Sequence, residues 1–253
     1  MSSLDELART PRLLVALDVD GTLAPLLDRP LEVRLTPQAR AAVNRLAGLP
    51  QTFVALVSGR TLEHLRIIGE HADDSPLLLA GSHGAEYWVP GEGEQQRSDD
   101  PAEVELRTRL LARAEVLVEP YEGAWIEPKT FGLAVHTRLS SEADGAKANK
   151  AVDELVVAEA PGWRRRTGRD IVEYAFREEG KDSAVRTLRE RTGATAVLFA
   201  GDDVTDEDAL GSLEPQDVGV RVGEGPTHAS LRVPDVAGMA ELLGRLAELR
   251  ARG

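Results

Sequence analysis

The sequence predicts an α/β fold in which a doubly wound, Rossmann-like parallel sheet carries an inserted, smaller α+β domain. Three observations support this prediction. Short apolar runs bounded by turn residues, typical of strands buried on both faces, occur near both ends of the chain. Helical patterns lie between those runs, which implies right-handed crossovers between parallel strands. The middle of the chain instead repeats a helix–strand–strand order, which favours a separate antiparallel sheet with helices on one face.

The core elements are expected near both ends of the chain. Apolar runs predict strands at 13–17, 53–57, 77–80 and 197–200. Helical spacing predicts helices at 36–46, 62–68 and 183–191, the first opening with Thr36 as a cap followed by Pro37. These elements assign residues 1–100 and 177–253 to one doubly wound α/β core.

The middle segment is expected to form the inserted domain. Its predicted helices are 102–118 and 142–159, and its predicted strands are 124–126, 132–136, 163–166 and 170–175. The Gly- and acid-rich stretch 90–101 and the stretch 177–180 are candidate hinges. Residues 101–176 are therefore interpreted as a second domain inserted into the first.

Composition narrows the class of protein. The 253 residues are 42% hydrophobic and carry a net charge of −13, which is typical of a soluble globular chain and predicts no nucleic-acid partner. The densest basic cluster, Arg164 to Arg166 with Arg169, is interpreted as a solvated strand edge. The absence of cysteine excludes disulfides, thiolate metal sites and a cysteine nucleophile. No leader and no apolar run near about 20 residues is evident, so we expect a cytoplasmic protein without a membrane partner, and we favour a monomer.

Polar motifs follow three of the predicted strands, where ligands bind in open α/β sheets. These motifs are Asp18-Val19-Asp20-Gly21-Thr22, Ser58-Gly59-Arg60 and Gly201-Asp202-Asp203. Carboxylates gathered at one edge raise each other's pKa unless a cation neutralises them. Mg²⁺ favours oxygen ligands and takes one or two carboxylates plus phosphate oxygens, which suits Asp18 and Asp202. The sequence thus predicts Mg²⁺ as the cofactor and phosphoryl transfer as the chemistry.

The motifs resemble those of the haloacid dehalogenase superfamily. Asp18 to Thr22 matches its first motif, Ser58 its second, Lys181 its third and Gly201 to Asp206 its fourth. Over nearly the whole chain the sequence is similar to the trehalose-6-phosphate phosphatases. That similarity rests on Leu56 to Arg60, Gly81 to Glu86, Glu127-x-Lys129, His136-x-Arg138 and Gly201 to Glu207. Two departures occur: Asp182 follows Lys181 where Gly is common, and Ala175 stands near Glu173 where a basic residue is frequent.

The resemblance implies that residues 1–100 and 177–253 form the catalytic core and that residues 101–176 form a cap domain that determines substrate specificity. It also implies a role for each motif. Asp18 would be the nucleophile, and Asp20 the general acid and then the general base. The backbone carbonyl of Asp20 would join the side chains of Asp18 and Asp202 on Mg²⁺. Ser58 and Lys181 would hold the phosphoryl oxygens. Together these roles predict Mg²⁺-dependent hydrolysis of a small sugar phosphate, trehalose 6-phosphate, to trehalose and phosphate through a phosphoaspartate.

Five further residues are predicted to bind substrate: Arg60, His83, Glu127, Lys129 and Glu173. Glu127 and Lys129 alternate along a strand and so share a face, although a solvated strand face explains them too. Arg60 has the alternatives of capping a carbonyl or forming a salt bridge with a surface acid, and His83 that of a satisfied buried histidine. His136 and Arg138 are interpreted as structural or as part of the cap surface.

Other residues have two readings. Asp203 and Asp206 either orient metal-bound water or are structural, whereas Thr205 and Asp208 fit a helix N-cap with an acidic first turn. Taken singly, Lys181 fits a solvated lysine at a helix start.

The alternative functions are hydrolysis of a sucrose-phosphate, glucosylglycerol-phosphate or pseudo-disaccharide phosphate, and non-catalytic sensing of a sugar phosphate. Intact candidate catalytic residues argue against the sensor.

Overall fold

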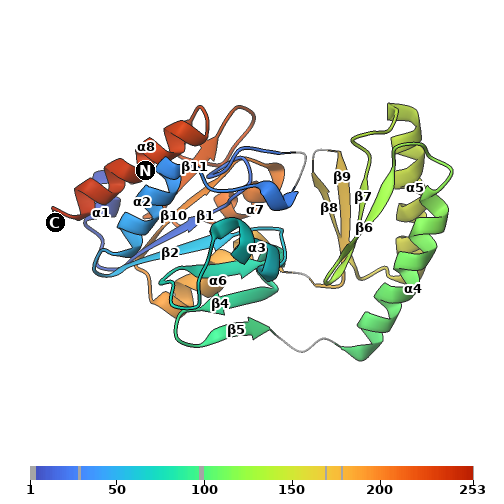
Figure 1. The fold of residues 1–253 in the computed structure, drawn as a ribbon, viewed down its shortest axis with the longest axis horizontal. Helices are drawn as coiled ribbons and strands as arrows, with labels where there is room; N and C mark the ends of the chain where they lie inside the picture. Colours follow the sequence, from blue (N-terminus) through green and yellow to red (C-terminus); the bar gives the residue numbers. More distant parts are fainter. Residues whose placement is uncertain (1–3, 28–29, 97–99, 169, 178, 253) are drawn as a thin grey trace. The chain divides into compact units, whose positions relative to one another are not determined.

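A computed structural model describes residues 4–27, 30–96, 100–168, 170–177 and 179–252. The chain divides into two compact units, unit 1 (residues 1–96 and 179–253) and unit 2 (residues 97–178) (Figure 1). The predicted fold class is confirmed, because unit 1 contains a largely parallel sheet between helices and unit 2 a separate antiparallel sheet. Within the described part of the chain, no helix is long and apolar enough to cross a membrane.

The sheet of unit 1 has eight strands in the order β12-β11-β10-β1-β2-β3-β4-β5. Pairing is parallel from β12 to β3 and antiparallel for β4 and β5. The strands are β1 (Leu13–Leu17), β2 (Thr52–Val57), β3 (Leu78–Gly81), β4 (Glu86–Val89), β5 (Gly93–Gln96), β10 (Ala196–Gly201), β11 (Val218–Val222) and β12 (Leu231–Val233). Because β10, β1 and β2 are parallel neighbours, the motifs that follow them meet at one edge of the sheet.

Helices cover both faces of this sheet (Figure 1). One face packs against α1 (Leu4–Ala8), α2 (Pro37–Ala47), α3 (Leu62–Gly69) and α8 (Val236–Arg250). The other packs against α6 (Lys181–Thr192) and α7 (Val204–Gly211). Alternation along β1 explains the two layers, since Leu13, Val15 and Leu17 join the first core while Leu14 and Ala16 join the second.

Unit 2 has its own sheet and its own core. The sheet order is β6-β7-β9-β8, all antiparallel, with β6 (Trp125–Lys129), β7 (Gly132–His136), β8 (Arg164–Gly168) and β9 (Ile171–Ala175). Helices α4 (Pro101–Val118) and α5 (Glu142–Glu159) pack on one face through a core that includes Leu110, Leu133 and Val152 (Figure 1). The opposite face of the sheet carries charged side chains.

The predicted strands and helices are present, with shifted ends and one correction. Residues 93–96 were expected to belong to a hinge, but they form β5, which pairs with β4. Gly91 and Gly93, at φ values of 81° and 79°, make the turn between those strands. Residues 97–99 and 178 of the candidate hinges lie outside the described residues, as does Arg169 of the basic cluster.

Two element boundaries have local causes. Thr36 caps α2 as predicted, its side chain accepting a hydrogen bond from Ala39 N. Helix α6 begins at Lys181, two residues before the predicted start. The hydroxyl of Ser183 accepts from Gly180 N at 2.9 Å and so satisfies a backbone donor at the helix start. Lys181 is thereby held on the first turn of a helix.

Candidate active site

Lys181 lies between two carboxylates at the edge of the unit 1 sheet. Asp18 follows β1 directly, and Asp206 lies in the first turn of α7. The Nζ atom of Lys181 donates to Asp18 Oδ1 at 2.7 Å and to Asp206 Oδ1 at 2.6 Å. All three residues are at most 4% exposed. The reading of Lys181 as a solvated lysine is therefore wrong.

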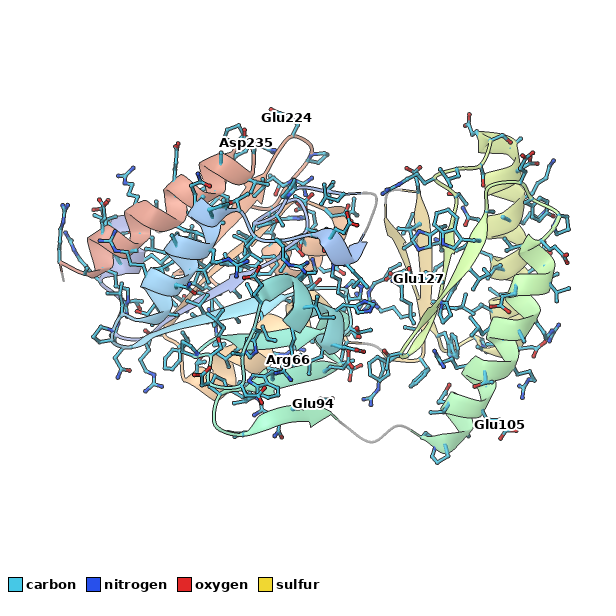
Figure 2. The ribbon with its side chains drawn as sticks, in the orientation of Figure 1. Arg66, Glu94, Glu105, Glu127, Glu224 and Asp235 are labelled. Atoms are coloured by element: carbon cyan, nitrogen blue, oxygen red, sulfur yellow. The ribbon has the colours of Figure 1, made fainter. Side chains whose placement is uncertain are left out.

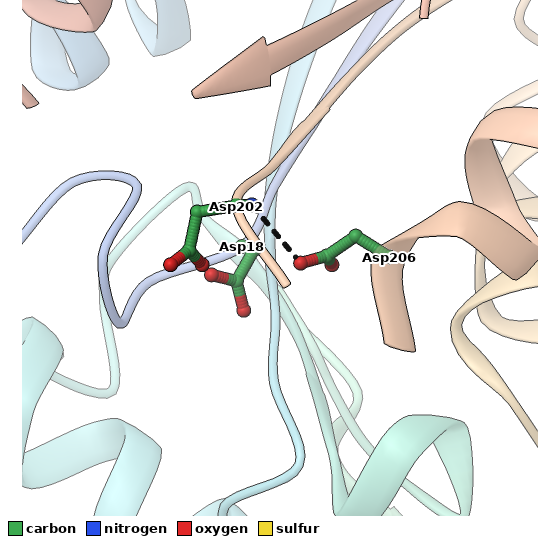
Figure 3. Close-up of side chains that lie close together, drawn as sticks. All are labelled: Asp18, Asp202 and Asp206. Carbon is green, nitrogen blue, oxygen red and sulfur yellow. Dashed lines mark hydrogen bonds between the residues drawn. The ribbon is translucent and has the colours of Figure 1, made fainter. Parts of the chain in front are cut away.

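Asp202 completes a cluster of three carboxylates, drawn in Figure 3. It follows β10, and its carboxylate lies where a Cβ at Gly21 would otherwise be. Gly21 also has φ of 78°, a conformation that favours glycine. One carboxylate oxygen from each of Asp18, Asp202 and Asp206 lies within 4.8 Å of the others. The first and fourth sequence motifs thus meet as predicted.

The cluster carries more negative charge than its lysine balances. Burial raises the pKa of Asp18 well above its usual value, and Lys181 offsets this only in part. Burial and the neighbouring Asp206 raise the pKa of Asp202 to about 7. Burial disfavours the charged form of Lys181, but Asp18 and Asp206 outweigh it and raise the lysine pKa above its usual value. Three carboxylates around one ammonium group are typical of a site that binds a further cation.

The donor set fits a hard divalent ion such as Mg²⁺, because every candidate ligand is a carboxylate oxygen. Asp206 differs from the other two members. Its Oδ1 accepts from Lys181, and its Oδ2 accepts from the backbone N–H groups of Asp202 and Asp203 at 3.1 and 3.0 Å. Asp18 and Asp202 are therefore the members best able to bind the ion directly, while Asp206 holds the loop that carries Asp202.

The residues at the start of α7 correct one prediction. Thr205 was interpreted as the helix N-cap, but the cap is Asp203, whose carboxylate accepts from Val204 N at 2.7 Å. Helix α7 therefore starts at Val204, and Thr205 lies inside it. An acidic residue at this cap also interacts favourably with the helix dipole. The role of Asp203 toward metal-bound water stays a prediction.

Asp20 and Arg60 form a two-pronged ion pair. Arg60 donates from Nε to Asp20 Oδ2 at 2.6 Å and from Nη2 to Asp20 Oδ1 at 2.7 Å. The two side chains are 15% and 26% exposed, so water reaches the pair only partly. Such two-pronged contacts between a guanidinium and a carboxylate fix the orientation of both groups and add to the strength of the ion pair. The structure thus places Arg60 on the predicted acid–base residue, while its predicted contact with substrate stays untested.

Ser58 lies in a backbone-anchored turn after β2. It is 2% exposed, and its hydroxyl oxygen accepts from Arg60 N at 3.1 Å. A hydroxyl that accepts in this way still has its proton to donate, for example to a phosphoryl oxygen. His83 packs against the same turn, because a Cβ at Gly59 would lie 2.7 Å from the imidazole ring. His83 itself has φ of 58°.

The remaining candidate residues gather on the open face of the unit 2 sheet. Lys129 Nζ lies 2.9 Å from Glu127 Oε2 and 3.5 Å from Glu173 Oε1. Glu127, labelled in Figure 2, also contacts His136 Nε2 at 2.6 Å, and the ring of His136 stacks on Trp125. Burial alone would raise the pKa of Glu127, but His136 and Lys129 outweigh it and lower the pKa to about 2. The predicted trio is therefore a connected polar cluster within unit 2.

One residue near the site was missed by the sequence analysis. Arg221 on β11 donates from Nη1 to Asp203 O at 3.0 Å and contacts Glu207, while its Nη2 donates to Glu224 O. It therefore supports the loop that carries Asp202. The signal was present in the sequence, because an arginine inside the apolar strand 218–222 must find buried partners.

The sequence profile of the trehalose-phosphatase family matches residues 16–236. The chain belongs to the trehalose-phosphatase family. The trehalose-phosphate phosphatase of Mycobacterium ulcerans (strain Agy99) is 30% identical over 248 residues, which are 94% of this chain and 62% of that protein. The bifunctional trehalose-6-phosphate synthase/phosphatase of Thermoproteus tenax is 32% identical over 247 residues, 95% of this chain and 33% of that protein. The chain thus spans less than two thirds of each of these relatives.

Solved structures show the same fold. The trehalose-6-phosphate phosphatase C-terminal domain of C. albicans matches 97% of this chain and 96% of its own, with a TM-score of 0.80 at 23% identity. A haloacid dehalogenase-like hydrolase from Bacteroides thetaiotaomicron matches 93% of this chain and 99% of its own, with a TM-score of 0.66 at 16% identity. This trehalose-phosphatase family chain therefore has the fold of the haloacid dehalogenase superfamily.

Proposed function

We propose that this chain is a Mg²⁺-dependent phosphatase that hydrolyses trehalose 6-phosphate through a phosphoaspartate on Asp18. The observation that carries the proposal is the carboxylate cluster of Asp18, Asp202 and Asp206, at the strand edge where substrates bind in this type of sheet. Asp18 and Asp206 are buried and share Lys181, whereas Asp202 is partly buried. Mg²⁺, held by the side chains of Asp18 and Asp202 and the backbone carbonyl of Asp20, would offset the charge of phosphoryl oxygens.

The side chains divide the reaction into two steps. In the first, a carboxylate oxygen of Asp18 attacks phosphorus, the bond from phosphorus to the sugar oxygen breaks, and Asp20 gives that oxygen a proton. In the second, Asp20 takes a proton from water, which attacks phosphorus and releases phosphate from Asp18. Ser58 and Lys181 donate hydrogen bonds to the phosphoryl oxygens in both steps.

Unit 2 supplies the proposed sugar specificity. Glu127, Lys129 and Glu173 offer acceptors and donors on one open sheet face, as recognition of a polyhydroxylated sugar requires. Ala175 occupies a position near Glu173 where the family often has a basic residue. Arg164 on β8 pairs directly with Ala175 on the same face, so a basic residue lies beside that position.

Phosphate release with Mg²⁺ tests the proposal directly. Trehalose 6-phosphate is compared with sucrose 6-phosphate, glucose 6-phosphate and p-nitrophenyl phosphate, with and without a chelator. We expect Mg²⁺-dependent preference for trehalose 6-phosphate and no turnover by a folded Asp18→Asn variant. Preference for another sugar phosphate would retain Asp18 and reject the roles of the unit 2 residues.

Absence of any hydrolysis would favour the non-catalytic sensor. The fold also occurs in a protein named for regulation, the trehalose synthase regulatory protein of Candida albicans, through its C-terminal domain. Its TM-score is 0.75 at 15% identity, with 96% of each chain covered. The fold alone therefore does not separate catalysis from regulation, whereas the substrate panel does.

A further inference from the structure

Glu86 is a buried carboxylate to which the phosphatase reaction assigns no role. It is the first residue of β4 and is only 7% exposed. Its Oε2 accepts a hydrogen bond from Leu62 N at 3.1 Å and another from Ser82 Oγ at 2.5 Å. Burying a carboxylate costs free energy unless the group is hydrogen-bonded or paired with a cation.

The strand register explains how Glu86 reaches both partners. Glu86 pairs with Gly81 across the β3–β4 hairpin. A Cβ at Gly81 would lie 2.6 Å from Leu62 N, so the missing side chain lets the start of α3 approach the hairpin closely. The carboxylate then meets the N-terminal end of α3, where a negative charge also interacts favourably with the helix dipole.

The hairpin loop that Glu86 holds is conformationally unfavourable. Ser82 and His83 have φ values of 47° and 58°, and Gly84 follows at 102°. Non-glycine residues in this region cost free energy and persist only where their surroundings fix them. The hydrogen bond from Ser82 Oγ to Glu86 is one such contact.

This loop in turn holds the turn that carries Ser58. Ser82 N donates to Arg60 O at 2.6 Å, and His83 N donates to Ser58 O at 2.9 Å. Gly84 packs against α6, because a Cβ there would lie 2.8 Å from the side chain of Ala184. The hairpin loop therefore touches the segments that carry Ser58, Arg60 and Lys181.

We propose that Glu86 is a positioning residue for phosphate binding, acting through Ser82 on the Ser58–Arg60 turn. The inference rests on the proposed phosphatase function, but phosphate binding can be measured without turnover. Without the Glu86 carboxylate, the 82–84 loop loses a support for its left-handed conformation. The backbone donors to Ser58 and Arg60 then lose their fixed position, and the Ser58 hydroxyl no longer points steadily at a phosphoryl oxygen.

The experiment measures inorganic phosphate binding to the full chain with Mg²⁺ by calorimetry, and phosphate inhibition of p-nitrophenyl phosphate hydrolysis. We expect Glu86→Gln and Ser82→Ala each to raise the dissociation constant for phosphate about tenfold, the size typical for a lost hydrogen bond to a charged group. The double variant should be no worse than the weaker-binding single variant, because both act through one contact. The KM for p-nitrophenyl phosphate should rise by the same factor, with a smaller change in kcat.

Glu63→Gln is the matched control, since Glu63 is an exposed acid in the first turn of the same helix α3. It should leave phosphate binding unchanged within about twofold, as surface substitutions usually do. A lower melting temperature for Glu86→Gln with unchanged phosphate binding would show a structural role only and overturn the proposal. If Glu86→Gln does not fold, unchanged binding in Ser82→Ala overturns it equally. Phosphate binding without turnover in the unaltered chain would reject the phosphatase function and leave the Glu86 test intact.

Discussion

Arg60 and Asp20 join the segments after β2 and β1 through two hydrogen bonds of 2.6 and 2.7 Å. Both oxygens of Asp20 accept from the same guanidinium group, so the direction of the carboxylate is fixed. The proposed acid and base role of Asp20 benefits from a fixed position, because proton transfer requires close approach. The pair therefore links the second sequence motif to the chemistry of the first.

Arg60→Lys should reduce turnover of trehalose 6-phosphate about ten- to hundredfold, because an ammonium group cannot reproduce the two-pronged contact. The loss should be smaller for p-nitrophenyl phosphate, whose leaving group needs no proton. Steady-state kinetics with both substrates measures the difference. Arg66→Lys, which changes an arginine over the ring of Trp88, serves as the control. Equal losses in kcat/KM, which reports on the first step alone, would contradict an action of Arg60 through the proposed acid role of Asp20.

Asp202→Asn should stabilise the metal-free protein at pH 8. Burial and Asp206 raise the pKa of Asp202 to about 7, so its charged form is disfavoured in the folded protein. We expect the melting temperature to rise by about 2–4 °C, as for a gain near 1 kcal/mol in a chain of this size. The same variant should lose the melting shift that Mg²⁺ gives the unaltered chain. A variant that keeps this shift would remove Asp202 from the metal site.

The apparent affinity for Mg²⁺ should depend on pH around neutrality. The folded pKa of Asp202, about 7, lies above its usual 3.8. The stabilisation that the folded protein gains from protonated Asp202 is therefore complete below about pH 4 and is lost as the pH rises through about 7. Mg²⁺ must displace that proton, so its apparent affinity should fall about tenfold per pH unit below 7 and level off above it. Calorimetric titration at pH 6, 7 and 8 measures this, and a flat profile would count against it.

Lys181→Met should lower the free energy of unfolding by about 3–5 kcal/mol, because it leaves the buried Asp18 and Asp206 without their shared cation. Lys147→Met is a suitable control, since the Lys147 side chain is 62% exposed and its ion pair with Asp144 is a surface pair. Denaturant unfolding of both variants gives the comparison. A loss below about 1 kcal/mol for Lys181→Met would mean that the ion pairs are not maintained in solution.

Glu127→Gln should raise the KM for trehalose 6-phosphate about tenfold and leave p-nitrophenyl phosphate unaffected, because only the sugar substrate has hydroxyl groups for unit 2 to bind. Kinetics with both substrates tests it, and Glu122→Gln provides an exposed control in the same unit. Similar losses on both substrates would instead indicate that the substitution disturbs unit 2 as a whole.

Acid should weaken the Glu127 cluster. The pKa of Glu127 is lowered to about 2, so its contribution to stability is present above its usual value of 4.5 and is lost as the pH falls toward 2. Tryptophan fluorescence during acid titration reports this loss through Trp125, which stacks on His136. The Trp125→Phe variant identifies that part of the signal.

The sequence predicted the strands that carry the chemistry because those strands are buried on both faces and read as apolar runs. It predicted the meeting of Asp18 with Asp202 for the same reason, since parallel neighbouring strands end at one edge. It missed β5, whose Gly-Glu-Gln-Gln sequence has no apolar pattern and whose pairing comes from the neighbouring strand. It also misplaced the cap of α7, because Asp203 and Thr205 are both good caps and only tertiary contacts decide between them.

Contacts between side chains distant in sequence were beyond such reasoning. The ion pair of Arg60 with Asp20 and the hydrogen bonds of Glu86 depend on hairpin register and on close approaches that glycines permit. The local sequence does not predict which of several nearby acidic residues an arginine will pair with. The different structural roles of Asp202, Asp203 and Asp206 likewise follow only from their individual hydrogen bonds.

Gly21 and Asp202 share one volume, since the carboxylate occupies the space that a side chain at position 21 would fill. The two positions are 181 residues apart along the chain (202 − 21). Replacement of Gly21 by any larger residue is therefore expected to displace the Asp202 carboxylate, although the two positions are distant in sequence. Without the aspartate side chain, position 21 loses this steric contact, although its φ of 78° still favours glycine. The glycine and the aspartate are thus sterically coupled.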